Sequence, residues 1–202
     1  MKLYVILTIM LVVLTNFRLF GQQELRNLSS LPDSLNHQLG VFLQIQSDNI
    51  VLINSSSDTI NVYANTGLLW YDLYAVDGNG EWQTIDNRGG YCGVGFGYYT
   101  VPPHQYSWIE GGYKQLGRQS ENSQSDHTTK IRVCMNIQNS VQICSEPKDA
   151  EIERWRFLPA HLYAYVINKK RLTGSALNEK YPNKTHYENQ IALLLDAYGL
   201  KI

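Results

Sequence analysis

The densest group of chemistry-bearing side chains is an aromatic and glycine-rich segment in the middle of the chain. It holds the following rings between residues 91 and 113: Tyr91, Phe96, Tyr98, Tyr99, Tyr106, Trp108 and Tyr113. Rings with a polar edge suit sites where one side is dry and the other wet, so this composition predicts a surface that binds a sugar or a peptide. The alternative is structural, with alternate rings in the core and the others covering strands. The sequence leaves both interpretations open.

Cys92 is a candidate nucleophile. Residues 90–93 (GYCG) superficially resemble the surroundings of a cysteine-protease nucleophile, with His104 or His161 as the base. A reactive thiolate needs a pKa lowered by an adjacent base or by a helix N-terminus. Residues 89–99 have a strand pattern and no helix pattern follows Cys92, so we predict no catalytic residue.

The sequence lacks the residue spacings that metal and cofactor sites require. No Cys-x-x-Cys or His-x-x-x-His pair occurs, and the histidines are scattered: His37, His104, His127, His161 and His186. The glycines near residue 93 are not followed by Gly-Lys-Ser/Thr, and there is no Gly-x-Ser-x-Gly. We therefore expect no metal ligand and no cofactor. Paired carboxylates can come from distant positions, so a hydrolase acting on an envelope or host polymer, with Cys92 or a carboxylate pair as its reactive group, stays as the alternative function.

Two of the three cysteines flank a predicted hairpin with residues 138–140 as its loop. In that register the apolar residues pair on one face, Ile137 with Val141 and Met135 with Ile143. A slip of one residue would turn the whole set over, so the pattern fixes the register. The same register places Cys134 opposite Cys144, within disulfide reach. We predict this disulfide with Cys92 left free; the alternatives are three reduced thiols or a bridge from Cys92 to either partner.

Residues 1–21 have the pattern of a secretory signal peptide. Lys2 precedes an uncharged apolar run over residues 3–14, and Gly21 offers a small residue for cleavage. The run is shorter than the roughly 20 apolar residues of a spanning helix. The alternative is an uncleaved membrane anchor. Cleavage predicts a secreted or periplasmic protein without a membrane span.

The charge of the predicted mature chain excludes one class of partner. Residues 1–21 contain Lys2 and Arg18 and no acid, which leaves 15 basic against 18 acidic side chains, a net charge of −3. This balance supplies no basic field for nucleic acid.

Short strands are predicted between residues 40 and 146, after a polar leader over residues 22–39. Alternation in residues 41–46 and 60–65, an apolar run at 68–76 and the Asp-Gly-Asn-Gly turn at 77–80 are typical of antiparallel hairpins. Residues 117–127 contain no apolar side chain and predict an exposed loop. Seven to nine such strands indicate an antiparallel sandwich.

The pattern changes to helical spacing after Pro147. Leu158, Leu162 and Val166 predict a helix that ends at Gly174, with Pro159 in its first turn. A second helix is predicted over residues 186–198, with Thr185 and Glu188 as a capping box and Gly199 as its stop. We expect this extension, residues 147–202, to pack on its own domain; binding a partner is the alternative.

Residues 40–146 resemble the immunoglobulin-like or fibronectin-III-like modules of exported bacterial proteins. The resemblance is carried by the Trp70–Trp82 hairpin, by residues 101–103 (VPP) before a strand, and by the Arg132 strand paired with residues 141–145. It implies an immunoglobulin-like sandwich and work in adhesion, ligand binding or spacing. A fold does not fix a function, so no functional residue is transferred. The function predicted is an exported, non-enzymatic binding or structural module, with a glycan or an envelope or host protein as ligand.

Overall fold

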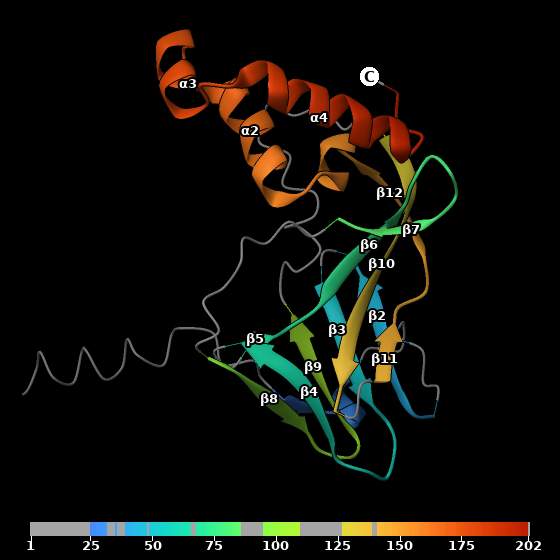
Figure 1. Cartoon of the computed structure of the whole chain (residues 1–202). Helices are drawn as coiled ribbons and strands as arrows, with labels where there is room; N and C mark the ends of the chain where they lie inside the picture. The colour runs from blue at the N-terminus through green and yellow to red at the C-terminus, as the bar shows by residue number, and fades with distance from the viewer. Residues whose placement is uncertain are drawn as a thin grey trace, which may run out of the picture.

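The computed structural model describes residues 25–31, 35, 39–47, 49–65, 68–85, 95–109, 127–138 and 141–201. These residues form two antiparallel sheets and a helical end (Figure 1). The chain is therefore mainly β with a helical C-terminal extension, as the sequence pattern predicts.

The smaller sheet has the strand order β1-β9-β3-β2. Its strands are β1 (Leu25–Asn27), β2 (Val41–Gln46), β3 (Asn49–Asn54) and β9 (Gln105–Ile109). Strand β2 follows the predicted alternation of apolar and polar residues, and it pairs with β3, whose apolar residues 50–53 are buried on both faces. Strand β3 pairs in turn with β9.

The larger sheet is built around the long strand β10 (His127–Ile137), which begins beside the helical end and runs away from it (Figure 1). Strands β6 and β12 pair with β10, as does β11, while β8 and β5 pair with β4. The strands are β4 (Ile60–Asn65), β5 (Leu68–Leu69), β6 (Asp72–Val76), β7 (Trp82–Thr84), β8 (Phe96–Val101), β11 (Val141–Cys144) and β12 (Lys148–Ile152).

One buried cluster joins the inner faces of both sheets to the helices. It combines Leu43, Ile50 and Leu52 of the smaller sheet with Val62, Ile131 and Val133 of the larger one. Helical residues including Leu162, Tyr165 and Leu195 belong to the same cluster. The two sheets and the helical extension therefore share a single core.

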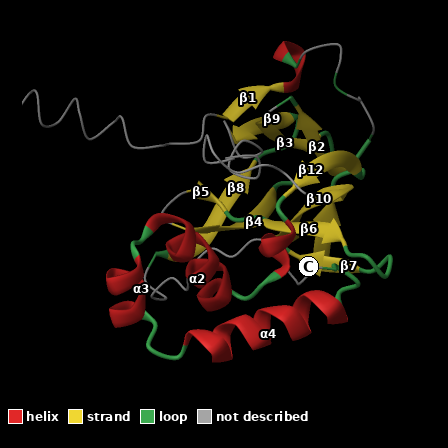
Figure 2. Cartoon of the chain, turned by 90° about the horizontal axis from the view of Figure 1, so that it is seen from above, coloured by secondary structure: helices red, strands yellow, loops and turns green. Residues whose placement is uncertain are grey.

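The helical extension comprises η3 (Arg154–Phe157), α2 (Ala160–Arg171), α3 (Gly174–Lys180) and α4 (Lys184–Ala197). These helices gather at one end of the molecule (Figure 2). Gly199, at φ +68°, ends α4 as predicted. The prediction that Gly174 ends a helix is wrong, because this glycine begins α3. The predicted capping box is also wrong: Asn183 is the N-cap of α4, and Thr185 lies inside its first turn.

The segment predicted as a polar leader contributes to the fold. Leu25–Asn27 forms β1 on β9, and η2 (Leu28–Ser30) follows. Leu31 and Leu35 are buried in a second cluster against Val51, Ile53 and Tyr106, on the other face of the smaller sheet. The apolar residues of this segment are sparse in the sequence, but Leu28, Leu31 and Leu35 cover that face, and Leu25 packs against the main core.

The predicted disulfide is confirmed. Strand β11 pairs with β10 in the predicted register, Ile137 opposite Val141 and Met135 opposite Ile143. Cys134 and Cys144 are bonded, with Cα atoms 4.1 Å apart. Cys92 lies outside the described residues.

Asn54 fixes the corner where the chain passes between the sheets at the ends of β3 and β8. Its buried amide nitrogen donates to the carbonyl oxygens of Asp58, Val101 and Pro102 at 2.8, 3.0 and 3.0 Å. Its amide oxygen accepts from the Ser56 hydroxyl at 2.6 Å and from the Ser56 backbone N–H at 3.2 Å. One side chain therefore satisfies carbonyl groups from two crossovers that strand pairing leaves free.

Candidate functional site

The outer face of the larger sheet, away from the shared core, carries a group of exposed rings on β4 and β8. Successive side chains of a strand alternate between faces, and directly paired residues share a face. Tyr63 pairs with Tyr98, and Asn65 with Phe96. Trp70 follows β5, and its backbone N–H donates to the Tyr63 carbonyl oxygen at 2.9 Å. We call Tyr63, Trp70, Phe96 and Tyr98 the outer strip.

The rings of the outer strip contact one another in two pairs. The Tyr63 and Tyr98 rings lie 5.0 Å apart between centroids, and the Trp70 and Phe96 rings lie 5.5 Å apart, edge to face. Tyr63, Phe96 and Tyr98 stay 40%, 47% and 52% exposed. A hydrogen bond between the Tyr98 and Tyr63 side chains raises the pKa of Tyr98 above its ordinary value. The ring faces and the hydroxyls of this strip are thus held in fixed positions at the surface.

A row of amide and hydroxyl groups continues the outer strip at one end. The Thr100 hydroxyl donates to the Asn61 side-chain oxygen at 2.8 Å, and the Asn61 amide donates to the Gln138 side-chain oxygen at 2.6 Å. Asn61 and Thr100 are cross-strand partners on the same face as Tyr63 and Tyr98. The strip therefore combines stacking surfaces with oriented hydrogen-bonding groups.

The structure separates the predicted ligand-binding residues. Phe96 and Tyr98 lie in the outer strip. Tyr99 points the other way along β8 and packs against the main core, where burial raises the pKa of its hydroxyl. Tyr106 is 1% exposed, and Trp108 packs beside it with the ring centroids 6.2 Å apart. Tyr91 and Tyr113 lie outside the described residues.

Sequence reasoning did not include Tyr63 or Trp70 in the candidate set. Both lie about thirty residues before Phe96 and Tyr98, and only the pairing of β4 with β8 brings them together. The available signal was Tyr63 at a polar position of an alternating strand, since a ring on the polar face of a strand is exposed.

A second aromatic group on the larger sheet is occupied by a side chain of the protein itself. The Arg132 guanidinium lies over the Trp82 ring at 4.2 Å and over the Tyr74 ring at 5.6 Å. Cation–π contacts of this kind order the arginine and cover the rings. These rings are therefore less available to a ligand than those of the outer strip.

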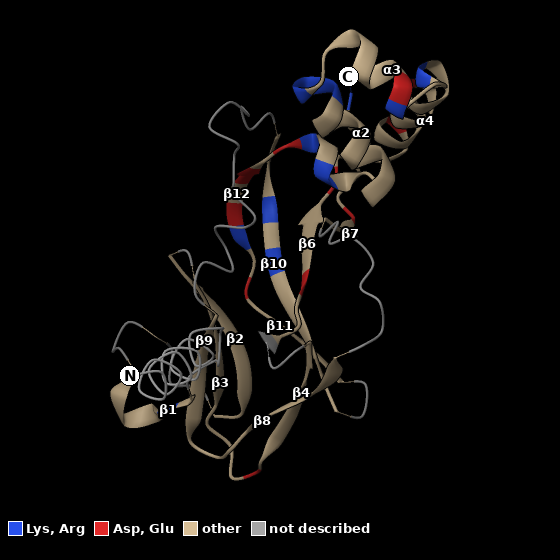
Figure 3. Cartoon of the chain, turned by 90° about the vertical axis from the view of Figure 1, so that its left-hand side faces the viewer, with Lys and Arg blue, Asp and Glu red and all other residues tan. Residues whose placement is uncertain are grey.

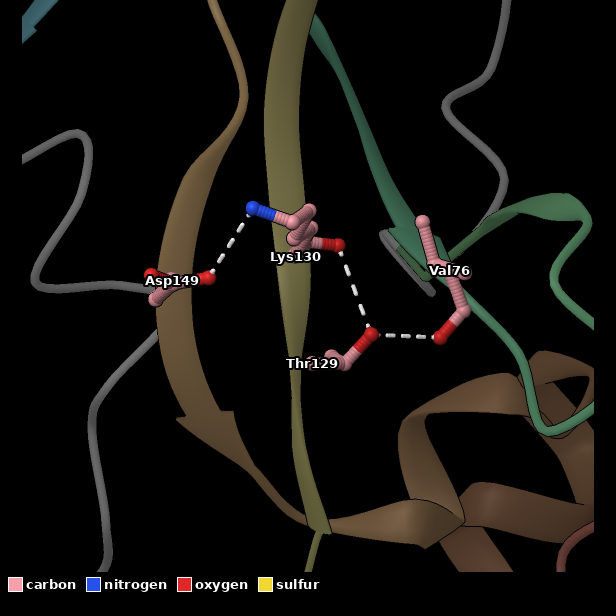
Figure 4. Close-up of polar contacts among 4 residues, drawn as sticks. All are labelled: Val76, Thr129, Lys130 and Asp149. Carbon is pink, nitrogen blue, oxygen red and sulfur yellow. Dashed lines mark hydrogen bonds and ion pairs between the residues drawn. The ribbon is translucent and has the colours of Figure 1, made fainter.

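Charged side chains lie mainly on β10, β12 and the helices (Figure 3). Lys130 of β10 forms an ion pair with Asp149 of β12 at 3.3 Å, and the Thr129 hydroxyl donates to the Val76 carbonyl oxygen at 2.5 Å (Figure 4). The strands at the other end contain no Lys, Arg, Asp or Glu: β2, β3, β4, β8 and β9. The two strands that carry most of the outer strip, β4 and β8, thus contain no charged residue.

The candidate catalytic pair cannot be placed, because Cys92 lies outside the described residues. His104 is exposed at a positive φ of 55° in the turn between β8 and β9, and His161 is exposed in the first turn of α2. No group of three His, Cys, Asp or Glu within the described ranges could hold a metal ion. In the same part of the chain, no helix is long and apolar enough to cross a membrane.

Comparison with known proteins adds no family to this description. No protein-family model matches the chain, and no curated protein matches its sequence significantly.

Proposed function

We propose that this chain is an exported binding or structural module of the immunoglobulin-like sandwich type, without catalytic chemistry, and that it holds its ligand against the outer strip. The observation that carries the proposal is the pairing of four rings on the outer face of β4, β5 and β8, three of them at least 40% exposed. The solvated face of an antiparallel sheet normally carries polar side chains, so the fold alone does not require exposed rings on this outer face. Contiguous exposed apolar surface of this kind marks interaction sites.

The disulfide supports export. Cystine bonds form and persist in oxidising compartments and are rare in the cytosol. Cys134 and Cys144 are bonded in the structure, and residues 1–21 carry the signal-peptide pattern. The proposed location is therefore the periplasm or the exterior of the cell, with a glycan or a protein of the envelope or host as the ligand. Export is tested by N-terminal sequencing of the protein from the producing cell, which should begin at Gln22.

Binding at the outer strip is tested with the purified chain immobilised and exposed to cell-envelope extract. Wild-type protein should retain a component that the double variant Phe96→Ala/Tyr98→Ala does not retain. Leu193→Ser is the matched control, because Leu193 is a 71% exposed apolar residue on α4, far from the strip in the fold. Equal retention by the wild-type protein and the double variant would overturn the assignment of the site. Release of soluble fragments from the extract would contradict the absence of catalysis.

A further inference from the structure

We infer that the ligand of the outer strip is a neutral polysaccharide chain. This inference rests on the proposed function, because it names the chemical class of the ligand for the same site. It is carried by the juxtaposition of contacting rings and oriented amides on two described strands, β4 and β8, that contain no charged residue.

The first step concerns charge. Neither β4 nor β8 contains Lys, Arg, Asp or Glu, and neither do β2, β3 or β9 of the neighbouring sheet. An anionic polymer is recognised through Lys and Arg, with an affinity that falls steeply with salt. Most described charges lie on β10, β12 and the helices (Figure 3), and the described charged residues nearest the strip in sequence, Asp58 and Asp72, are acidic and supply no cation for such a polymer. A neutral ligand has no charged group that must be desolvated when it binds, and it requires no oppositely charged side chain on the protein.

The second step concerns the combination of groups. A sugar ring presents C–H groups on its faces and hydroxyls around its edge. The half-exposed rings of Tyr63, Phe96 and Tyr98 offer surfaces for the C–H faces, and the Tyr63 and Tyr98 hydroxyls lie at the edge of the same rings. Amide and hydroxyl groups of Asn61 and Thr100 lie next along the strands and can exchange hydrogen bonds with sugar hydroxyls. A purely apolar ligand would leave the remaining hydrogen-bonding capacity of these groups unused.

The third step concerns extent. Phe96, Tyr98 and Thr100 lie two residues apart on one face of β8, so their Cα atoms are spaced at about 6.6–6.8 Å along the strand. The strip and its polar end together run for about 13 Å along the ribbon of β4 and β8. This is a row of contacts for several consecutive sugars on an open sheet face, and it fits an internal segment of a chain.

The fourth step concerns preorganisation. The rings contact each other within each of the two pairs, and Asn61 is hydrogen-bonded to both Thr100 and Gln138. Groups already held in position lose little conformational freedom when a ligand binds. The strip therefore requires no closing movement to form the site.

The inference is tested by affinity electrophoresis of the purified full chain in native gels. One series of gels contains neutral polysaccharides of α and β linkage: glucans, a galactomannan and a xylan. A second series contains the anionic polymers alginate and hyaluronan. We expect retardation by at least one neutral polymer, with an affinity that changes little between about 50 and about 500 mM NaCl, since no ion pair is screened. Tyr98→Ala and Phe96→Ala should each weaken binding by about tenfold, equivalent to about 1.4 kcal/mol.

Two control variants separate stacking from other effects. Tyr98→Phe keeps the ring and should retain most of the affinity, whereas Trp82→Ala removes a ring from the same sheet outside the strip and should leave binding unchanged. Circular dichroism checks that each variant folds, and exposed positions such as Tyr98 tolerate substitution well. Retardation by the anionic polymers alone, retardation by neutral polymers that the strip variants do not weaken, or no retardation by any polymer would each overturn the inference. If the strip variants lose an envelope protein while no polysaccharide binds, the proposed function stands and the ligand class is wrong.

Discussion

Gly78 and Gly199 touch, and their contact joins the turn between β6 and β7 to the C-terminal end of α4. A Cβ atom added to Gly78 would lie 2.4 Å from the Gly199 carbonyl oxygen and 2.9 Å from the Tyr198 carbonyl oxygen. The Gly78 backbone N–H donates to the Tyr198 carbonyl at 2.8 Å, and the Asn79 amide donates to the Ala197 carbonyl at 2.8 Å. The hairpin turn thus supplies donors to the last carbonyls of the helix, which have no partner within it.

Gly78→Ala should destabilise the protein by about 1–3 kcal/mol, the usual cost of forcing an extra methyl group into packed structure. The obstacle is backbone, which cannot move aside as a flexible side chain can. The melting temperature should fall by several degrees, with hydrogen exchange accelerated at the end of α4. Gly174→Ala is the control: nothing lies within 4 Å of its added Cβ at the start of α3, so this substitution should be neutral or slightly stabilising. Equal melting temperatures for the two variants would contradict the role of the contact.

Asn54→Ala should cost about 1–3 kcal/mol, because it leaves buried carbonyl oxygens at the sheet corner without donors. Asn54→Asp should cost more at neutral pH, where a carboxylate would face those same oxygens. Asn183→Ala serves as the control, since the side chain of Asn183 makes no capping hydrogen bond at α4. Urea denaturation of the three variants measures the differences. A cost for Asn54→Ala no greater than that of the control would show that the corner does not depend on this amide.

Glu188 makes stability depend on pH at the helical end. The Lys169 ammonium at 2.6 Å and the Tyr165 hydroxyl at 3.1 Å both donate to its Oε1 and hold the pKa of Glu188 below its ordinary value of 4.5. Lys184 adds a smaller attraction in the same direction. A lowered folded pKa stabilises the protein fully above the unfolded value, and this stabilisation is lost as the pH falls through the folded value.

Glu188→Gln should therefore destabilise the protein at pH 7 and have progressively less effect below about pH 4.5. Both partners are about half exposed, so the difference at pH 7 should be small, about 0.2–1 kcal/mol. Glu179→Gln on α3 is the control, because Glu179 is exposed and makes no ion pair among the described residues. Chemical denaturation at pH 7 and at pH 3 gives the comparison. A difference between wild type and Glu188→Gln that persists unchanged at pH 3 would contradict this explanation.

The strands and turns that are marked by a local residue pattern could be predicted from the sequence. Two kinds of local signal marked these elements. The alternation of apolar and polar residues marked β2, β4 and the paired strands β10 and β11, and the turn residues 77–80 marked the boundary between two strands. Strand β1 could not be predicted in this way, because its residues gain their role only by pairing with β9. Strand β12 is rich in charged residues and extends the larger sheet beyond residue 146, where the sandwich was expected to end.

The sequence predicted that the candidate site is rich in aromatic rings, but it did not predict which rings belong to the site. The segment around Phe96 and Tyr98 is visibly rich in rings, and two of its members lie on the exposed face. Which rings face outward depends on the register of β8 against β4, and that register depends on contacts distant in sequence. Likewise, Glu188 matches a capping box in sequence, but the structure directs it to Lys169 and Tyr165 of α2.

The Cys134–Cys144 bond ties β11 to the rest of the larger sheet, and its loss should be felt mainly in that strand. Among the described strands β11 pairs only with β10, so the bond and four residue pairs hold it in place. Cys134 is fully buried, whereas Cys144 is half-buried in the shorter strand. The two cysteines are ten residues apart, so the loop they close is short and the entropic stabilisation is on the order of 2–3 kcal/mol at most.

The double variant Cys134→Ser/Cys144→Ser should therefore remain folded with a lower free energy of unfolding and faster hydrogen exchange over residues 141–144. Cys92→Ser is the matched control and should change neither property, because the sequence predicts Cys92 to be a free thiol. Peptide mapping of the exported protein without reduction gives the most direct measurement: it should yield one cross-linked peptide pair, containing Cys134 and Cys144, and an alkylated Cys92. A cross-linked peptide that contains Cys92, or three alkylated cysteines, would show that the hairpin bond does not form in the cell.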